Sequence, residues 1–183
     1  VWLSWPRNPN TWPGKFEPVP AEYAFFARAI ADYQPVHILA GGEVLAVAEK
    51  LVGGVKNITL HDIETNDSWC RDHGPIFVQR PEGGPGSQLI LDWGFNAWGG
   101  KYPPYALDDV IPTRIAEELG IPVYHPGMIL EGGSIDVNGR GTLLTTEACL
   151  LNPNRNPQLG REAIAAMKII AGTARSMGIS VND

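Results

Sequence analysis

The sequence has little positive charge, few cysteines and no long hydrophobic run. Its 183 residues include 14 Lys and Arg against 20 Asp and Glu, a net charge of -6. A nucleic-acid-binding surface needs a basic stripe, so this balance argues against a nucleic-acid partner. No run of about 18 apolar residues is present, which argues against a membrane partner. Two cysteines are too few for a disulfide framework, and we expect a reducing, cytoplasmic location.

The first residues do not look like a targeting segment. Residues 1–6 (VWLSWP) contain neither a basic n-region nor an apolar h-region, so no signal peptide is expected. Because the chain opens at Val1 rather than at a methionine, we expect that the natural N-terminus has been removed.

Short strand patterns alternate with helical ones along the chain. Frequent glycine (21) and proline (16) predict many turns. We expect one compact unit of the α/β (or α+β) class. The first helix has Tyr23, Phe26, Ile30 and Tyr33 on one face. Strands are expected at 2–5, 36–40, 57–63, 76–79, 89–92, 123–125, 128–131, 134–137 and 142–145, and helices at 21–33, 43–52, 109–120 and from about 158.

An acidic loop follows the third expected strand. Residues 62–72 contain four carboxylates, one arginine and Trp69. Carboxylates bind a planar guanidinium bidentately, and a tryptophan face attracts a cation, so the loop suits a cationic ligand. The alternative is a solvated turn, in which Asn66 and Asp67 cap backbone N–H groups and Arg71 neutralises a neighbour. The residues alone leave both interpretations open.

Other residues that could carry chemistry have structural alternatives. Cys70 beside His73 could be a nucleophile with its base, but a small buried cysteine is the favoured interpretation. Glu131 ends an apolar strand before two glycines, where it could orient a histidine or cap a bulge. Residues 92–100 (DWGFNAWGG), with Trp93, Asn96 and Trp98, either wall a pocket or cap the core. No paired-histidine spacing supports a metal site, so no metal is expected.

Five motifs together resemble the agmatine deiminase and bacterial-type peptidyl-arginine deiminase family. They are residues 1–6 (VWLSWP), 66–75 (NDSWCRDHGP), 92–100 (DWGFNAWGG), 130–135 (LEGGSI) and 141–157 (GTLLTTEACLLNPNRNP). The resemblance implies the pentein fold, a propeller-like fan of ββαβ blades. It also implies cofactor-free hydrolysis of a small guanidinium substrate: agmatine would give N-carbamoylputrescine and ammonia, a step of putrescine biosynthesis.

The resemblance also implies roles for individual residues. Asp72 matches the aspartate that grips the guanidinium, Trp69 the tryptophan beside it, and Glu131 the glutamate that supports the catalytic histidine. Residues Asn66, Asp67 and Arg71 lie in the same motif and are expected to bind substrate. Cys70 occupies a variable position, so it does not inherit the nucleophile's role.

Two later motifs of the family do not occur in this sequence. One is a Gly-His-x-Asp motif with the general base, and the other is an Asn-x-His-Cys motif with the nucleophile. We therefore expect an incomplete domain over 1–166, about the N-terminal half of the fan, followed by a departing tail over 167–183. Such a chain should be inactive alone and able to self-associate. Three alternatives remain: a peptidyl-arginine deiminase, a non-catalytic cation-binding remnant, and a carbohydrate-active enzyme pairing Asp67 or Asp72 with Glu131.

Overall fold

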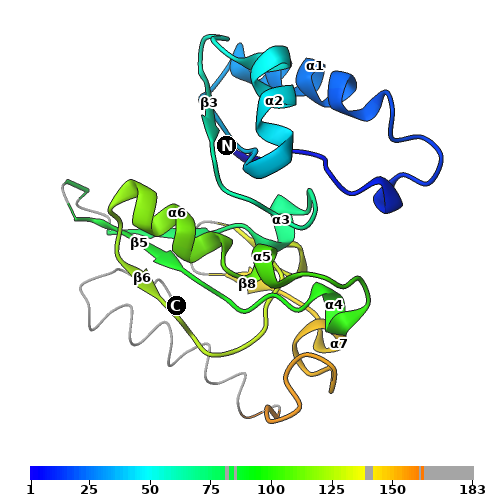
Figure 1. The fold of residues 1–183 in the computed structure, drawn as a ribbon. Coiled ribbons are helices and arrows are strands. Elements are labelled where there is room, and N and C mark those ends of the chain that lie inside the picture. Colours follow the sequence, from blue (N-terminus) through cyan, green and yellow to red (C-terminus); the bar gives the residue numbers. More distant parts are fainter. Residues whose placement is uncertain (81–82, 85, 139–141, 161, 163–183) are drawn as a thin grey trace. The chain divides into compact units, whose positions relative to one another are not determined.

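A computed structural model describes residues 1–80, 83–84, 86–138, 142–160 and 162 (Figure 1). Helices and strands are mixed along the chain, which confirms the expected class. The expectation of one compact unit is wrong, because the chain forms two. Unit 1 comprises Val1–Arg71 with Pro104–Asp108, and unit 2 comprises Asp72–Pro103 with Asp109–Asp183. The expected tail over 167–183 lies outside the described residues.

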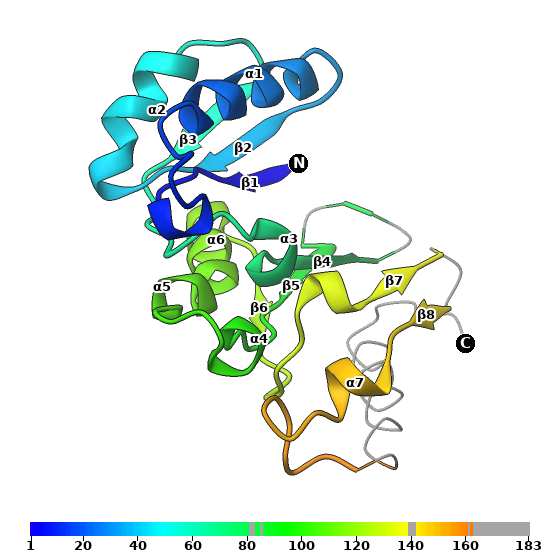
Figure 2. The same cartoon turned by 90° about the vertical axis from the view of Figure 1, so that its right-hand side faces the viewer.

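Unit 1 is a three-stranded parallel sheet covered by two helices. The strands pair in chain order β1-β2-β3. Right-handed connections between successive parallel strands place both helices on one face, as Figures 1 and 2 show. Its elements are β1 (Trp2–Ser4), η1 (Pro9–Thr11), α1 (Val19–Ala31), β2 (Val36–Leu39), η2 (Gly42–Val44), α2 (Leu45–Val52) and β3 (Ile58–His61).

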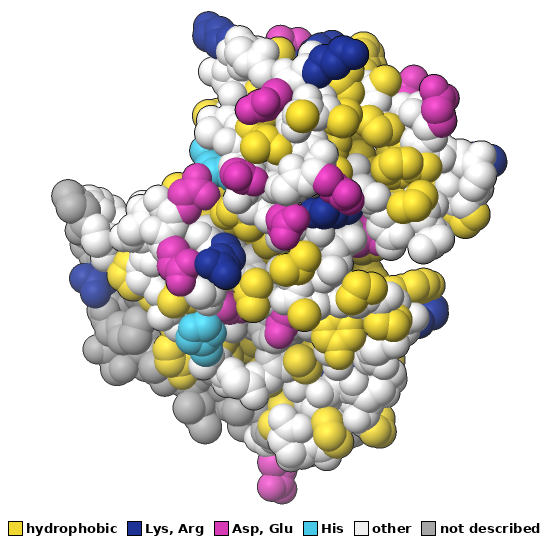
Figure 3. All heavy atoms as spheres, viewed as in Figure 1, with side chains coloured by type: hydrophobic (Ala, Val, Ile, Leu, Met, Phe, Trp, Pro, Cys, Tyr) yellow, Lys and Arg dark blue, Asp and Glu magenta, His cyan; other side chains and the backbone are white. Residues whose placement is uncertain are grey.

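The core of unit 1 uses small residues on its first helix. Ala24, Ala27 and Ala31 of α1 are buried beside Trp5 and the β2 side chains. Tyr23 and Ile30 pack partly against this core, as their spacing suggested. In contrast, Phe26 and Tyr33 are 50% and 89% exposed. Hydrophobic side chains consequently gather on the surface over α1 (Figure 3).

Unit 2 is built around a mixed three-stranded sheet. β4 (Ile76–Gln79) pairs antiparallel with β5 (Gln88–Leu91), and the two strands form a hairpin. β5 pairs parallel with β6 (Val123–Tyr124), and α6 (Ile111–Leu119) connects these two strands. The remaining elements are α4 (Ala97–Gly100), η3 (Gly132–Ser134), β7 (Asp136–Val137), β8 (Leu143–Leu144) and α7 (Glu147–Leu150).

Several short elements differ from the expectations. The polar loop at 64–75 ends in a helical turn, α3 (Cys70–His73), and a second turn, α5 (Ala106–Asp109), precedes α6. The strand expected at 128–131 is reduced to one bridge between Ile129 and Gly94. Residues 158–160 are not helical, and the rest of that expected helix falls largely outside the described residues. Among the described residues no helix has the length and apolarity to cross a membrane.

Candidate active site

The loop before α3, in unit 1, is held by backbone hydrogen bonds to a buried carboxylate. The N–H groups of Asn66 and Asp67 donate to Oδ1 of Asp108 over 2.6 and 3.3 Å. In return, Oδ1 of Asn66 accepts from the N–H of Leu107 over 2.8 Å. Asp108 lies about 40 residues from the loop it contacts, so no local pattern in the sequence points to it.

Asp67 is a buried residue whose carboxylate makes internal hydrogen bonds. Its side chain accepts from the Asn8 amide over 3.0 Å, from the hydroxyl of Thr11, and from the Ser68 N–H over 2.8 Å. Asp67 is only 8% exposed. The bond to the Ser68 N–H fits the backbone-capping alternative, but Asp67 is buried and so is not part of a solvated turn. Direct substrate binding by Asn66 or Asp67 stays a prediction.

Trp69, Cys70 and Arg71 follow this loop within unit 1. Trp69 is 42% exposed, so part of its indole ring is accessible to a ligand. Arg71 is also exposed. Burial raises the pKa of Cys70 to about 11, although a hydrogen bond with Ser4 opposes the shift. A thiol with that pKa stays protonated at neutral pH, which supports the interpretation that Cys70 is not a nucleophile.

Asp72 in unit 2 is positioned by a glycine from a distant motif. The Gly133 N–H donates to Oδ1 of Asp72 over 3.2 Å. A Cβ atom at Gly133 would lie 2.3 Å from that same oxygen, so only glycine allows this approach. Motifs 61 residues apart thus meet at Asp72.

Glu131 stands two residues before that glycine and is almost completely buried. Its Oε1 accepts from Nε of Arg155 over 2.8 Å, and the two side chains are 3% and 11% exposed. Next to Arg155, the Asn156 amide bonds both the N–H and the C=O of Ile129 over 2.9 Å. The turn at 152–157 therefore fixes the segment that carries Glu131.

Sequence reasoning missed the roles of Arg155 and Asn156. Both lie in the motif LLNPNRNP that carries the family resemblance, but nothing in that string reveals which carboxylate the arginine meets. A buried glutamate needs a charged or polar partner, so an arginine elsewhere in the chain was to be expected.

The tryptophan-rich loop at 92–100 contributes chiefly to packing. Trp93 is 9% exposed and lies in a core cluster with Leu130 and Leu150. Trp98 packs edge-on against Phe95, with ring centroids 5.5 Å apart. Asn96 caps α4, because its Oδ1 accepts from the Gly99 N–H over 2.8 Å. The core-capping alternative therefore describes most of this loop.

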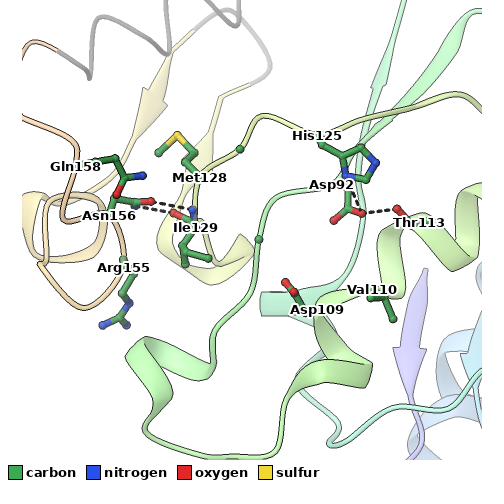
Figure 4. A pocket seen from close by; sticks show the side chains of 12 residues that line it. Asp92, Asp109, Val110, Thr113, His125, Met128, Ile129, Arg155, Asn156 and Gln158 are labelled. Carbon is green, nitrogen blue, oxygen red and sulfur yellow. Dashed lines mark hydrogen bonds and ion pairs between the residues drawn. The ribbon is translucent and has the colours of Figure 1, made fainter.

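A cavity of about 520 Å³ lies elsewhere in unit 2 (Figure 4). Asp92, Thr113 and His125 meet on one side, and the turn at 155–158 forms the other. Oδ2 of Asp92 accepts from the Thr113 hydroxyl over 2.5 Å and lies 3.4 Å from Nδ1 of His125. Burial raises the pKa of Asp92, which these two partners partly counter. None of the site residues expected from the sequence lines this cavity.

No group of three His, Cys, Asp or Glu residues suited to a metal occurs in the part of the chain that the structure describes.

Comparisons with known proteins agree with these motifs. The chain is 42% identical over 172 residues to "Agmatine deiminase" of Stutzerimonas stutzeri, an alignment covering 91% of this chain and 46% of the relative. It superposes on an agmatine deiminase of Enterococcus faecalis with a TM-score of 0.81 and 36% identity, over 91% of this chain and 46% of that one. A C. jejuni agmatine deiminase with substrate bound gives a TM-score of 0.75 and 30% identity, over 98% and 50%.

The chain spans about half the length of the curated relatives it matches. The sequence model of the Porphyromonas-type peptidyl-arginine deiminases matches residues 1–174. The match covers most of the chain and includes every motif described above. The chain therefore belongs to the Porphyromonas-type peptidyl-arginine deiminase family.

Proposed function

We propose that this chain carries guanidinium-binding residues of an agmatine deiminase. The reaction would be agmatine plus water giving N-carbamoylputrescine plus ammonia. One observation carries the proposal: the Gly133 N–H holds the carboxylate of Asp72, so two family motifs distant in sequence meet at the residue expected to grip the guanidinium. The relatives named agmatine deiminases support the choice of substrate.

The chemistry of the individual residues suits a planar cation. The carboxylate of Asp72 can accept two parallel N–H groups of a guanidinium. The exposed face of Trp69 can add cation–π attraction of about 1 kcal/mol. Glu131 is buried and held in one orientation by Arg155. In that orientation it would support the catalytic histidine of a complete enzyme.

The chemical step needs a nucleophilic cysteine and a general-base histidine, and this sequence has neither of the motifs that supply them. In the mechanism that the resemblance implies, a cysteine thiolate attacks the guanidinium carbon, ammonia leaves, and water then releases the ureido product. Histidine is absent after residue 125 and cysteine after residue 149. We propose that residues 1–166 form about the N-terminal half of a pentein fan, that the nucleophile and the general base come from the other half, and that no cofactor takes part. A cytoplasmic location and self-association remain further parts of the proposal.

Agmatine binding to the 183-residue chain tests the proposal. Titration with agmatine, followed by two-dimensional NMR, should shift the Trp69 indole and Asp72 backbone signals. Putrescine is the matched control ligand, because it keeps the distal amine and lacks the guanidinium. Equal shifts with putrescine, or no shift with agmatine at millimolar concentration, would overturn the proposal.

A second substrate class has specific support. The family is named for peptidyl-arginine deiminases, which act on arginine within a peptide. Trp69 is 42% exposed, which leaves room beside it for a ligand larger than agmatine. N-acetyl-arginine amide, which mimics arginine within a peptide, should bind more weakly than agmatine if our assignment is right. Tighter binding of the peptide mimic would reassign the substrate to peptidyl-arginine.

A further inference from the structure

Three consecutive backbone N–H groups just before Trp69 donate to carboxylates. Those of Asn66 and Asp67 donate to Asp108, over 2.6 and 3.3 Å, and that of Ser68 donates to Asp67 over 2.8 Å. Such a hydrogen bond becomes stronger when the accepting carboxyl group is ionised. The direction in which the chain enters Trp69 is therefore fixed by these two carboxylates.

The contact between the loop and α5 is reciprocal. Asp108 holds the backbone of Asn66, and the side chain of Asn66 accepts the N–H of Leu107 over 2.8 Å. Residues 66 and 108 thus form one clamp, with a side-chain acceptor contributed from each side. The side chain of Asn66 is engaged in this clamp, and that of Asp67 accepts from Asn8 and Ser68, so both side chains already have partners inside the protein.

Asp108 is an unusual residue to find in this place. It is 2% exposed, and a buried carboxylate carries a large desolvation cost unless hydrogen bonds compensate it. Burial raises the pKa of Asp108 to about 7; the two backbone donors and the charge of Arg7 partly counter this shift, and the charge of Asp67 adds to it. A leucine would be easier to bury but could not accept these N–H groups, so an acceptor side chain at this position has a role beyond packing.

We infer that Asp108 is a positioning residue of the substrate site, which acts through the clamp with Asn66 to fix the loop at 66–68 and so the orientation of Trp69. The part concerning substrate rests on the proposed function, because it takes Trp69 to contact the guanidinium. The part concerning the loop does not.

The experiment compares four single variants of the 183-residue chain and one double variant, in which Asn66 and Asp108 are both replaced by alanine. Asp108→Ala removes the oxygen that accepts both N–H groups, and Asp108→Asn keeps one side-chain oxygen for them. Asn66→Ala removes the reciprocal acceptor. Asp92→Ala is the matched control, because it deletes another buried carboxylate, 8% exposed, whose hydrogen bond comes from the Thr113 hydroxyl of α6 rather than from this loop. The readouts are the backbone amide signals of residues 66–68, the Trp69 indole signal, and the agmatine dissociation constant.

Asp108→Ala should move the amide signals of residues 66–68 and the Trp69 indole signal and raise the agmatine dissociation constant about tenfold. Asp108→Asn should keep these signals close to their original positions and the agmatine dissociation constant close to that of the parent chain. Asp92→Ala should leave the loop signals in place even if it lowers the melting temperature. Because Asn66 and Asp108 form one clamp, the double alanine variant should bind agmatine about as weakly as Asp108→Ala alone.

Unchanged loop signals in Asp108→Ala would overturn the inference, as would equal changes in Asp92→Ala. Additive affinity losses in the double variant would show that Asn66 contacts the substrate directly, which also contradicts it. If the unmodified chain fails to bind agmatine, the proposed function fails, while the loop signals and their rescue by Asp108→Asn still decide whether Asp108 positions Trp69.

Discussion

At the scale of single residues, Asp72 is the most direct test of the proposed substrate. Asp72→Asn keeps the shape and removes the charge and one of the two acceptors that a guanidinium needs. We expect the agmatine dissociation constant to rise at least about thirtyfold, which is about 2 kcal/mol. Isothermal titration calorimetry measures this. Asp136→Asn, at an exposed carboxylate of β7, is the control and should bind like the parent. Near-normal affinity in Asp72→Asn would remove this residue from the site.

Cys70 should behave as an unreactive thiol. Burial raises its pKa to about 11, so its thiolate is a very small fraction at pH 7.5. In a Cys149→Ser background Cys70 is the only cysteine, and its alkylation by iodoacetamide can be followed by mass spectrometry. The rate should rise about tenfold per pH unit between pH 7 and 10 without levelling. N-acetylcysteine supplies the reference rate, and a plateau near pH 7 would reveal an activated nucleophile instead.

Asp108 should make the protein less stable as the pH rises. Its pKa is raised to about 7, mainly by burial, above the value of about 3.9 expected for an unfolded chain. Between these values the folded chain holds a proton that the unfolded chain releases, so this contribution to stability is lost as the pH rises toward 7. The free energy of unfolding, relative to that of Asp108→Asn, should fall by up to a few kcal/mol between pH 4.5 and 8. Urea titrations at several pH values measure it, and a rise would show that the carboxylate is stabilised in the fold.

At the scale of elements, helices and strands with a periodic pattern could be predicted from the sequence, whereas helices of a single turn could not. The strand at 36–39 and the helix at 111–119 repeat a pattern over enough residues to be recognised. In contrast, α3, α5 and α7 have four residues each, which is little more than one helical turn. The inward face of α1 was misjudged in part, because three alanines pack against the core while Phe26 points outward. Helical spacing identifies residues that share a face, but packing decides which face is buried.

A substitution in the η3 turn at 132–134 should weaken agmatine binding but leave the stability of the fold almost unchanged. A Cβ at Gly133 would lie 2.3 Å from Oδ1 of Asp72, at the end of a side chain that can rotate away. We therefore expect Gly133→Ala to weaken agmatine binding about tenfold or more while changing the free energy of unfolding by less than about 1 kcal/mol. Calorimetry and urea unfolding give the two values.

Gly160→Ala is the matched control for this element, because no atom of the described residues lies within 4 Å of its added Cβ. It should change neither quantity. Full agmatine affinity in Gly133→Ala would mean that the contact between Gly133 and Asp72 does not orient the carboxylate.

At the scale of the whole molecule, local motifs were recognisable and the contacts between them were not. The string around Asp72 and the string around Glu131 could each be assigned a role from the sequence. That Gly133 touches Asp72, or that Arg155 pairs with Glu131, depends on chain folding over 61 and 24 residues. Single-sequence patterns carry no information on such pairings. The residues that orient the site were therefore the ones missed.

The chain alone and the chain joined to the other half of a relative should differ in catalysis. The proposed mechanism requires a thiolate and a histidine that no residue of this chain matches, and losing a nucleophile costs roughly a millionfold in rate. The 183-residue chain should therefore bind agmatine without releasing ammonia.

Joined to the part of the Stutzerimonas stutzeri agmatine deiminase that lies beyond the matched region, the chain should release ammonia steadily. In that hybrid Asp72→Asn should abolish turnover and Cys70→Ser should keep it. An enzymatic ammonia assay, with sedimentation of the same samples to detect self-association, measures both forms. Steady turnover by the chain alone would show that it contains a complete catalytic site, with Cys70 the first residue to re-examine.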